Sequence, residues 1–440
     1  MDKSMPEEKR MRITVDAGKT LLVDGPASVT LVSGETEVFG HSLRQTGKVV
    51  IRDGKRMPFI VKEKATFDIL LGENASIEEV DGDTVPMSWE EAYKEVVAIQ
   101  KRPLTLLVLG NVDSGKTSFC TYLANKLVKD GCKVAILDGD IGQSDIGPPC
   151  TVAYALVSKP VTDLFNLEAT NAYFVGVTSP SRALERVIRG IISLREELLK
   201  HNPDYIIVNT DGWVEGEEAV SYKLQIVEKI APDMVFGIQQ SERLTPILTA
   251  LKNFKTLAVD SPQTIKQRSR DKRRSLRELG YIKYLKGAKI QSIPMSWVKV
   301  ENDEIIGSNR TFGMAKREKE IYSLLGMKPL HIAELKDKIH VIIGKGRWIS
   351  PEKIRSLEEV LGKKVTVACN GDEEGSLTAL YNAEGKFLGI GVLRKIDYIR
   401  KVLKIFTPVS GSISTVVIGK VRLDKNLREI SSIQDEAKVL

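Results

Sequence analysis

The sequence predicts a multidomain protein in which a central α/β domain, with a parallel sheet covered by helices on both faces, is flanked by two smaller domains. Two observations predict it. The 440 residues exceed the roughly 100–200 residues of one domain. The apolar pattern also changes twice, from short alternating segments to buried strands separated by helical stretches, and then to β-rich segments again. We therefore expect an N-terminal β-sandwich or barrel over residues 1–95, the central domain over 96–290, and a small mixed α/β or β-barrel domain over 291–440.

The composition is that of an ordinary globular protein. It is 42% hydrophobic and 28% charged, which excludes collagen-like and mostly disordered classes. No run of about eighteen apolar residues occurs, and the charged start lacks the apolar core of a secretory signal, so we expect a cytoplasmic protein without membrane contact. The four Cys and four His are too scattered for a zinc or CxxC site, and reduced thiols are expected. The net charge of +7 is compatible with an anionic partner without demonstrating one.

The N-terminal part alternates apolar and polar residues between Gly-containing turns, which is typical of a small β-domain. From residue 88 to 100 the spacing is helical, with Trp89, Ala92 and Val96 on one face, and Pro103 ends the helix. A domain boundary is therefore expected near residues 90–102. The alternating segments are residues 12–15, 20–23, 28–32 and 48–51.

In the central part, buried apolar strands alternate with amphipathic helices, the signature of a parallel sheet. The expected strands are residues 105–109, 133–137, 172–177, 205–208, 234–238 and 256–259. The expected helices are residues 118–129, 182–200 and 217–230. Beyond about residue 290 we expect strands at 340–343, 365–368 and 415–418, with a helix near 351–361 and no chemistry.

A phosphate-binding loop follows the first central strand. Its pattern is G-x-x-x-x-G-K-[ST], between a strand and a helix, which is the context this motif requires. Backbone N–H groups of such a loop wrap phosphates, Lys116 neutralises their charge, and the Thr117 hydroxyl can bind Mg²⁺. A chance Gly-rich turn is the alternative. The loop consists of Gly110, Asn111, Val112, Asp113, Ser114, Gly115, Lys116 and Thr117.

Two absences narrow the class of nucleotide-binding protein. No Asn-Lys-x-Asp tetrad follows a later strand, which weighs against a GTPase. Position 111 is Asn, where dimeric partitioning and arsenical-pump ATPases have an extra lysine. A nucleotide kinase or transferase is favoured.

Acidic residues follow the second central strand. Asp138, Asp140 and Gln143 come at its carboxyl end, where ligands bind in this architecture. Asp140 could take a proton from an attacking hydroxyl, and Asp138 or Asp140 could hold Mg²⁺. A solvated loop with an N-capping aspartate is the alternative.

Three further features lie on the acceptor side. Arg182, Arg186 and Arg189 recur along a helix and could be a surface stripe. Trp213 is either a core anchor or a stacking platform. A dense basic segment at 266–289 could be a solvated helix face, but beside a phosphate loop it favours a mobile arginine lid.

In order, these motifs resemble the polynucleotide 5′-hydroxyl-kinase family, P-loop kinases that act on RNA ends in tRNA splicing, pre-mRNA cleavage and rRNA processing, with an archaeal-like member expected. The resemblance spans nearly the whole chain. Its motifs are Gly34-x-x-Glu37-x-Phe39-Gly40, the loop at 110–117, Asp138-x-Asp140-x-Gly142-Gln143, Thr178-x-Pro180, Asn209-Thr-x-Gly-Trp213 and Arg268-Ser-x-Asp-x-Arg273-Arg274.

The resemblance implies roles for individual residues. The N-terminal β-domain, with Glu37, would help hold the nucleotide, and Asp140 would activate the 5′-hydroxyl. Thr178 and Gln143 would contact the acceptor strand, and Trp213 would stack on its terminal base. Arg268 and Arg273 would stabilise the transition state from the lid. After Pro180 the chain reads Ser-Arg instead of a Gly-Thr-like continuation.

The implied reaction transfers the γ-phosphoryl group of ATP, with Mg²⁺ or another divalent cation, to the 5′-hydroxyl of RNA or of single-stranded or duplex DNA. RNA-processing proteins are the implied partners, and the C-terminal domain would complete the RNA groove. Two alternatives remain open at this point. One is a catalytically silent scaffold that holds ATP, and the other is a P-loop ATPase without an acceptor.

Overall fold

The structure is a computed structural model that describes residues 9–301, 314–334 and 338–430. Its contacts divide the chain into two compact units, residues 1–280 and 281–440. The first unit contains both an N-terminal β-domain and the central α/β domain, so the three-domain division remains a prediction. Within the described ranges, no helix combines the length and apolarity needed to cross a membrane.

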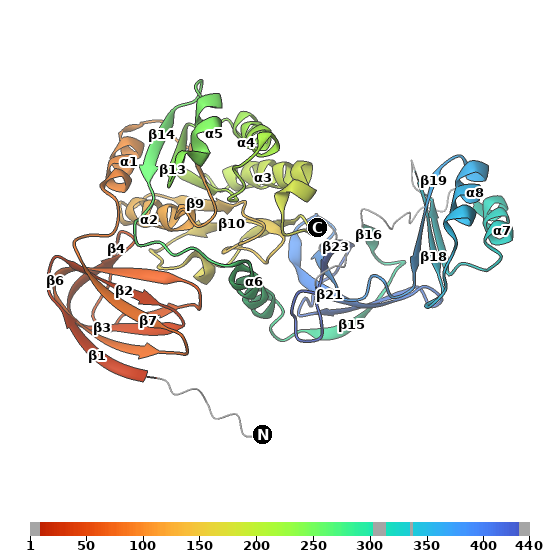
Figure 1. The fold of residues 1–440 in the computed structure, drawn as a ribbon, viewed down its shortest axis with the longest axis horizontal. Coiled ribbons are helices and arrows are strands. Elements are labelled where there is room, and N and C mark those ends of the chain that lie inside the picture. Colours follow the sequence, from red (N-terminus) through yellow and green to blue (C-terminus); the bar gives the residue numbers. More distant parts are fainter. Residues whose placement is uncertain (1–8, 302–313, 335–337, 431–440) are drawn as a thin grey trace. The chain divides into compact units, whose positions relative to one another are not determined.

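The β-domain is one seven-stranded antiparallel sheet (Figure 1). Its longest strand, β6, pairs with β2 through Arg56–Ile60, with β1 through Ala65–Leu71 and with β3 along its other edge. Alternate side chains point into a core that includes Phe59 and Phe67, whose rings meet edge to face at 5.8 Å. The four predicted segments are therefore strands. The strands are β1 (Lys9–Val15), β2 (Lys19–Asp24), β3 (Ala27–Val38), β4 (His41–Ser42), β5 (Lys48–Ile51), β6 (Arg56–Leu71) and β7 (Ser76–Asp81).

The central sheet has the order β11-β10-β9-β12-β8-β13-β14. The five strands from β9 to β14 in this order are parallel, as predicted, and every residue of β8 is buried. This arrangement brings the carboxyl ends of β8, β9 and β12 to one edge of the sheet. The strands are β8 (Leu104–Gly110), β9 (Val134–Asp138), β10 (Thr151–Val157), β11 (Asn171–Phe174), β12 (Tyr205–Asn209), β13 (Met234–Gln239) and β14 (Thr256–Asp260).

The prediction of a purely parallel sheet is wrong at one edge. Strand β10, which the sequence pattern did not reveal, runs antiparallel to both β9 and β11. The cause is the connection from β9 to β10, a loop of residues 139–150 without a helix. A parallel return needs a crossover, usually a helix, whereas a strand that returns directly from the same edge must pair antiparallel.

Helices cover both faces of this sheet (Figure 1). On one face α1 and α2 pack together, and Trp89 and Phe119 stack edge to face at 5.3 Å. On the other face α3, α4 and α5 bury a continuous apolar cluster with the strands. Predicted and observed helices differ by at most two residues at either end. The helices are α1 (Met87–Ala98), α2 (Lys116–Lys129), α3 (Leu184–Leu199), α4 (Glu217–Ile230), α5 (Thr245–Ala250) and α6 (Arg270–Tyr284), with single turns η1 (Leu164–Asn166), η2 (Pro180–Arg182) and η3 (Glu242–Leu244).

The C-terminal unit has two sheets and two apolar clusters, and Ile342 of the three-stranded sheet belongs to the cluster of the six-stranded sheet. A six-stranded sheet has the order β15-β22-β21-β20-β23-β16, and a three-stranded sheet β17-β18-β19 carries α7 and α8. The predicted strands and helix of this part are present. The elements are β15 (Lys289–Pro294), β16 (Lys299–Glu301), α7 (Met314–Leu325), β17 (His331–Glu334), β18 (Lys338–Ile343), α8 (Pro351–Leu361), β19 (Lys364–Cys369), β20 (Ser376–Tyr381), β21 (Phe387–Asp397), β22 (Val402–Thr407) and β23 (Thr415–Arg422).

Candidate active site

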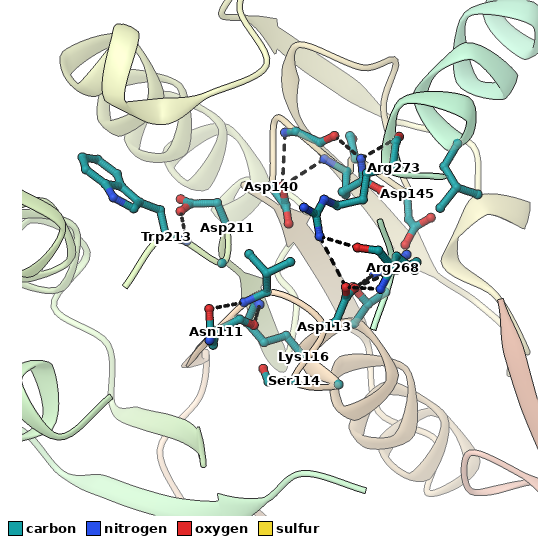
Figure 2. Close-up of a pocket in the computed structure, with 18 of the residues that line it drawn as sticks. Asn111, Asp113, Ser114, Lys116, Asp140, Asp145, Asp211, Trp213, Arg268 and Arg273 are labelled. Atoms are coloured by element: carbon teal, nitrogen blue, oxygen red, sulfur yellow. Dashed lines mark hydrogen bonds and ion pairs between the residues drawn. The ribbon is translucent and has the colours of Figure 1, made fainter. Parts of the chain in front are cut away.

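A pocket of about 570 Å³ lies at the carboxyl edge of the central sheet (Figure 2). Six segments that are distant in sequence line it. They are the phosphate loop, the loop after β9, the segments that follow β11 and β12, a basic turn of the β-domain between β5 and β6, and residues 265–277, which we call the lid segment. Most of the predicted site residues line this pocket, namely Asn111, Val112, Asp113, Ser114, Gly115, Lys116, Thr117, Asp140, Gln143, Thr178, Trp213, Arg268 and Arg273.

Three predicted residues do not line the pocket. Gly110 is the last residue of β8 and starts the phosphate loop. Asp138 is the last residue of β9 and lies behind the pocket wall, fully buried. Glu37 lies in β3 of the β-domain. Their roles in nucleotide or metal binding remain predictions.

The phosphate loop has the tight backbone that its glycines permit. Gly115 has a φ of +97° and caps α2, which begins at Lys116. A Cβ at Gly110 would lie 2.6 Å from the Ser114 hydroxyl oxygen and 3.2 Å from the Ile238 carbonyl oxygen, so any larger residue would crowd the loop. The Ser114 Oγ itself is buried and finds no hydrogen-bond partner in the described part of the chain. A buried hydroxyl in this position lacks an acceptor that a phosphate oxygen would supply, so the loop fits a nucleotide phosphate.

Lys116 is the buried cation of the pocket. Its side chain leaves the first turn of α2, and its Nζ donates to the Asn111 carbonyl oxygen at 2.7 Å. Burial lowers the pKa of Lys116 to about 8, although the nearby Asp140 carboxylate opposes this shift. A nucleotide phosphate would act in the same direction as Asp140 and favour the charged amine.

Two aspartates end β9, and their environments differ. Both Asp138 oxygens are occupied: Oδ1 accepts from the Asn209 amide at 3.0 Å, and Oδ2 accepts from the Asp145 backbone N–H at 2.8 Å. Burial raises the pKa of Asp138 to about 7, with the charges of Asp140 and Asp145 adding to the effect. Asp138 therefore fixes the loop after β9, a structural task that the sequence did not indicate.

Asp140 has one oxygen held and one that faces the pocket (Figure 2). Its Oδ1 accepts from the backbone N–H groups of Gly142 at 3.1 Å and Gln143 at 2.9 Å, whereas Oδ2 has no partner among the described residues. Burial raises the pKa of Asp140, while the neighbouring Lys116 lowers it. The side chain is thus fixed in orientation and retains an oxygen that can accept a proton.

The Mg²⁺ ligands can be tested against these contacts. The Thr117 hydroxyl and Asp140 both belong to the pocket lining, and Asp140 Oδ2 is not engaged, so this pair fits a hard cation with oxygen ligands. The contacts of Asp138 do not favour its predicted metal role, because a metal would have to displace the N–H groups that hold it.

The β-domain contributes a basic turn that the sequence analysis did not single out. Arg52 pairs with Asp145 at 2.6 Å and with Asp163 at 2.7 Å, and Lys55 pairs with Asp145 at 2.9 Å. Asp145 is buried, and although burial alone would raise its pKa, Lys55 and Arg52 hold the pKa well below its usual range. The density of basic residues at 52–56 was the available signal. The turn ties the β-domain to the loop after β9.

Behind Trp213 lies a buried ion pair. Asp211 and Lys223 are paired at 2.9 Å, with side-chain exposures of 6% and 0%. Asp211 also accepts from the Tyr222 hydroxyl at 2.9 Å and from the Trp213 backbone N–H at 3.0 Å. The Trp213 ring is half-buried and lies 5.8 Å from the Tyr222 ring. Trp213 is thus packed against the core and still lines the pocket, which is compatible with both of its predicted readings.

The two predicted lid arginines meet at the phosphate loop (Figure 2). Arg268 forms ion pairs and hydrogen bonds with Asp113, and Arg273 Nη1 lies 3.5 Å from the same carboxylate. The Gln143 side chain donates to the Arg273 carbonyl oxygen at 3.0 Å, which connects the lid segment to the loop of Asp140. The lid segment therefore closes over the phosphate loop in this structure.

The chain is similar to known proteins over most of its length. A family described as the P-loop of the mRNA cleavage and polyadenylation factor CLP1 matches residues 110–287. A Pyrococcus furiosus protein named polyribonucleotide 5′-hydroxyl-kinase is 31% identical over 359 residues, which are 80% of this chain and 97% of that protein. A protein of the same name from Methanocaldococcus jannaschii is 29% identical and covers 79% of this chain and 95% of its own length.

A solved structure extends the likeness to the fold. Clp1p in complex with a segment of Pcf11p aligns with a TM-score of 0.65 over 95% of this chain and 99% of that chain, at 14% identity. That protein and this chain share a multidomain α/β P-loop fold. The identity to the Pyrococcus protein, sustained over nearly its whole length, shows that the chain belongs to the polyribonucleotide 5′-hydroxyl-kinase family.

Proposed function

We propose that this protein is an ATP-dependent kinase that transfers the γ-phosphoryl group of ATP to the 5′-hydroxyl end of RNA. The observation that carries the proposal is the pocket itself: Lys116, the half-engaged Asp140 and the arginines of the lid segment all line it. Relatives that are 27% to 31% identical are named polyribonucleotide 5′-hydroxyl-kinases. Both the chemistry of the pocket and the family therefore favour an RNA kinase over a silent scaffold or an acceptor-independent ATPase.

In the proposed reaction the 5′-hydroxyl oxygen of the acceptor attacks the γ-phosphorus, and the bond from that phosphorus to the β–γ bridging oxygen breaks. The acceptor proton goes to Asp140 Oδ2, and ADP leaves. Two backbone N–H groups hold the other Asp140 oxygen, so the base is oriented before the acceptor arrives. A general base of this kind contributes on the order of 10²- to 10⁴-fold.

Charge neutralisation supplies most of the remaining catalysis in phosphoryl transfer. Lys116 and the backbone N–H groups of the loop would bind the β- and γ-phosphates, and the buried Ser114 hydroxyl would gain its missing acceptor there. A divalent cation, when bound, would neutralise charge on the same phosphates, with the Thr117 hydroxyl as a direct ligand and Asp140 holding the cation through water, so that Asp140 Oδ2 stays able to take the acceptor proton. Its identity as Mg²⁺ is part of the proposal.

On the acceptor side, Trp213 would stack on the terminal base, with Gln143 and Thr178 beside the strand. The half-buried ring, braced by Tyr222, supports a platform that keeps its orientation. DNA ends are a further proposed substrate. RNA-processing proteins are proposed partners because the related Clp1p was solved with a segment of Pcf11p. A cytoplasmic location is part of the proposal.

The test is transfer of label from γ-labelled ATP. The purified protein is incubated with Mg²⁺ and a short 5′-hydroxyl RNA, beside its 5′-phosphorylated twin and a DNA of the same sequence. Label on the 5′-hydroxyl RNA and none on the phosphorylated twin is the expected result. Bound ATP without labelled product would indicate the scaffold, and phosphate release without an acceptor would indicate the ATPase.

A further inference from the structure

We infer that Asp113 and Arg268 act as one positioning pair, which holds the lid segment on the phosphate loop so that Arg273 is the arginine that contacts the transferring phosphoryl group. The inference rests on the proposed function and gives different roles to two arginines that the sequence treats alike. Asp113 occupies a position where the loop motif accepts any residue, so the motif itself assigns it no task.

The contacts between Asp113 and Arg268 are those of a fixed pair. The Arg268 backbone N–H donates to Asp113 Oδ2 at 2.9 Å, and its Nε donates to Oδ1 at 2.7 Å. Arg268 Nη2 is also paired with Oδ1. A carboxylate that binds both a backbone N–H and a guanidinium fixes the direction of the chain as well as the side chain. The Asp113 side chain is 1% exposed, so the pair is shielded from water on that side.

Electrostatics explains why Asp113 needs a partner. A carboxylate in a loop that wraps a polyphosphate repels its ligand, and a buried carboxylate without a counter-charge is strongly unfavourable. The positive charge of Arg268 neutralises Asp113. It therefore removes both the repulsion of the polyphosphate and the cost of burying an unpaired carboxylate. The same contact leaves Arg268 with little capacity to neutralise a phosphate.

Arg273 is held differently. Its Nη1 donates to the Arg268 carbonyl oxygen at 2.8 Å and lies 3.5 Å from Asp113 Oδ2. Its Nε and Nη2 find no partner within the described residues, and the side chain lines the pocket. Arg273 is therefore oriented through the Asp113–Arg268 pair, with two nitrogens still available to a phosphoryl group.

Kinetic variants separate these roles. Asp113 has a φ of +55°, so Asp113→Gly removes the carboxylate without the backbone strain that alanine would add. Arg268→Met and Arg273→Met keep the apolar stems of the arginines. The variants are compared singly and in pairs for kcat and for the KM of ATP.

If Asp113 and Arg268 act as a unit, Asp113→Gly and Arg268→Met lower kcat by similar factors. The kcat of the double variant then lies within about twofold of the kcat of either single variant. Arg273→Met alone lowers kcat by about 10²- to 10³-fold, which is the loss typical of a transition-state donor. The same substitution lowers kcat by a smaller factor when Asp113→Gly is already present. A kcat that is unchanged or higher in Asp113→Gly, together with a large loss in Arg268→Met, would overturn the assignment.

Limited trypsin digestion tests the positioning without any kinase activity. The lid segment is rich in trypsin sites, and cleavage between residues 266 and 274 is followed by mass spectrometry. Asp113→Gly is expected to speed this cleavage by about tenfold or more, because the lid segment opens more often. Asp68→Asn, which breaks a similar carboxylate–arginine pair with Arg12 on the β-domain, is the matched control and should leave cleavage unchanged. Unchanged cleavage in Asp113→Gly would refute the positioning, whereas a wild type that labels no RNA would refute only the proposed function.

Discussion

The buried pair of Asp211 and Lys223 gives the most direct test of how the pocket is supported. Lys223→Met keeps the length of the side chain and removes its charge. The Lys223 Nζ lies 2.9 Å from both the Asp211 carboxylate and the Asp211 carbonyl oxygen, and its side chain is fully buried. Removing one partner of such a pair leaves an uncompensated buried charge, which costs about 3–5 kcal/mol.

The expected loss is therefore about 3–5 kcal/mol in the free energy of unfolding, measured by urea denaturation. Lys255→Met serves as the control, because it removes a surface ion pair between Lys255 and Glu95. These two side chains are 53% and 57% exposed, and the expected loss in the free energy of unfolding is below about 0.5 kcal/mol. The double variant Lys223→Met with Asp211→Asn should recover part of the loss, since no buried charge remains. If Lys223→Met is as stable as the control variant, the buried pair does not support this side of the pocket.

Three further outcomes are expected. Lys116→Ala and Asp140→Asn should each abolish label transfer and leave the circular dichroism spectrum unchanged, so normal turnover by either variant would contradict the mechanism. The pH profile of kcat/KM should be bell-shaped. Activity rises as Asp140 loses its proton, at a pH above the ordinary carboxyl pKa because burial raises the pKa of Asp140. Activity falls again as Lys116 deprotonates with a pKa of about 8. A profile that stays flat to pH 10 would exclude Lys116 as the alkaline group. Arg52→Met should lower kcat as well as stability, since Arg52 holds Asp145 and Asp145 holds Asp138; a stability loss with full kcat would limit the β-domain turn to a structural role.

The sequence predicted the parts of the site that depend on local order. The loop at 110–117 was recognisable because its spacing is required by phosphate geometry and its flanks are a strand and a helix. Asp140 was recognisable because it follows a buried strand at the edge where ligands bind. The strand β10 was missed because the loop before it contains no helix to mark a crossover.

The pairings that support the site could not be predicted, because they join residues that are distant in sequence. Asp113 and Arg268 are 155 positions apart, and Arg52 and Asp145 are 93 apart. Nothing in local spacing indicates which arginine of a basic run meets a given carboxylate. These pairs are set by tertiary packing of the β-domain and the lid segment around the central sheet. The pattern of a single sequence does not show which of its distant segments pack together.

The distribution of these partners also supports the proposal that Asp140 is the base. Five aspartates lie in or behind the pocket wall, and three of them, Asp113, Asp145 and Asp211, are neutralised by an arginine or a lysine. The oxygens of these three carboxylates are occupied by the cations and by neighbouring N–H and O–H donors, which leaves none of them for an acceptor proton. Asp138 has no ion pair in the described part of the chain, but N–H groups occupy both of its oxygens. Asp140 alone of the five combines a raised pKa with an oxygen open to the pocket, so its environment matches the requirements of a general base.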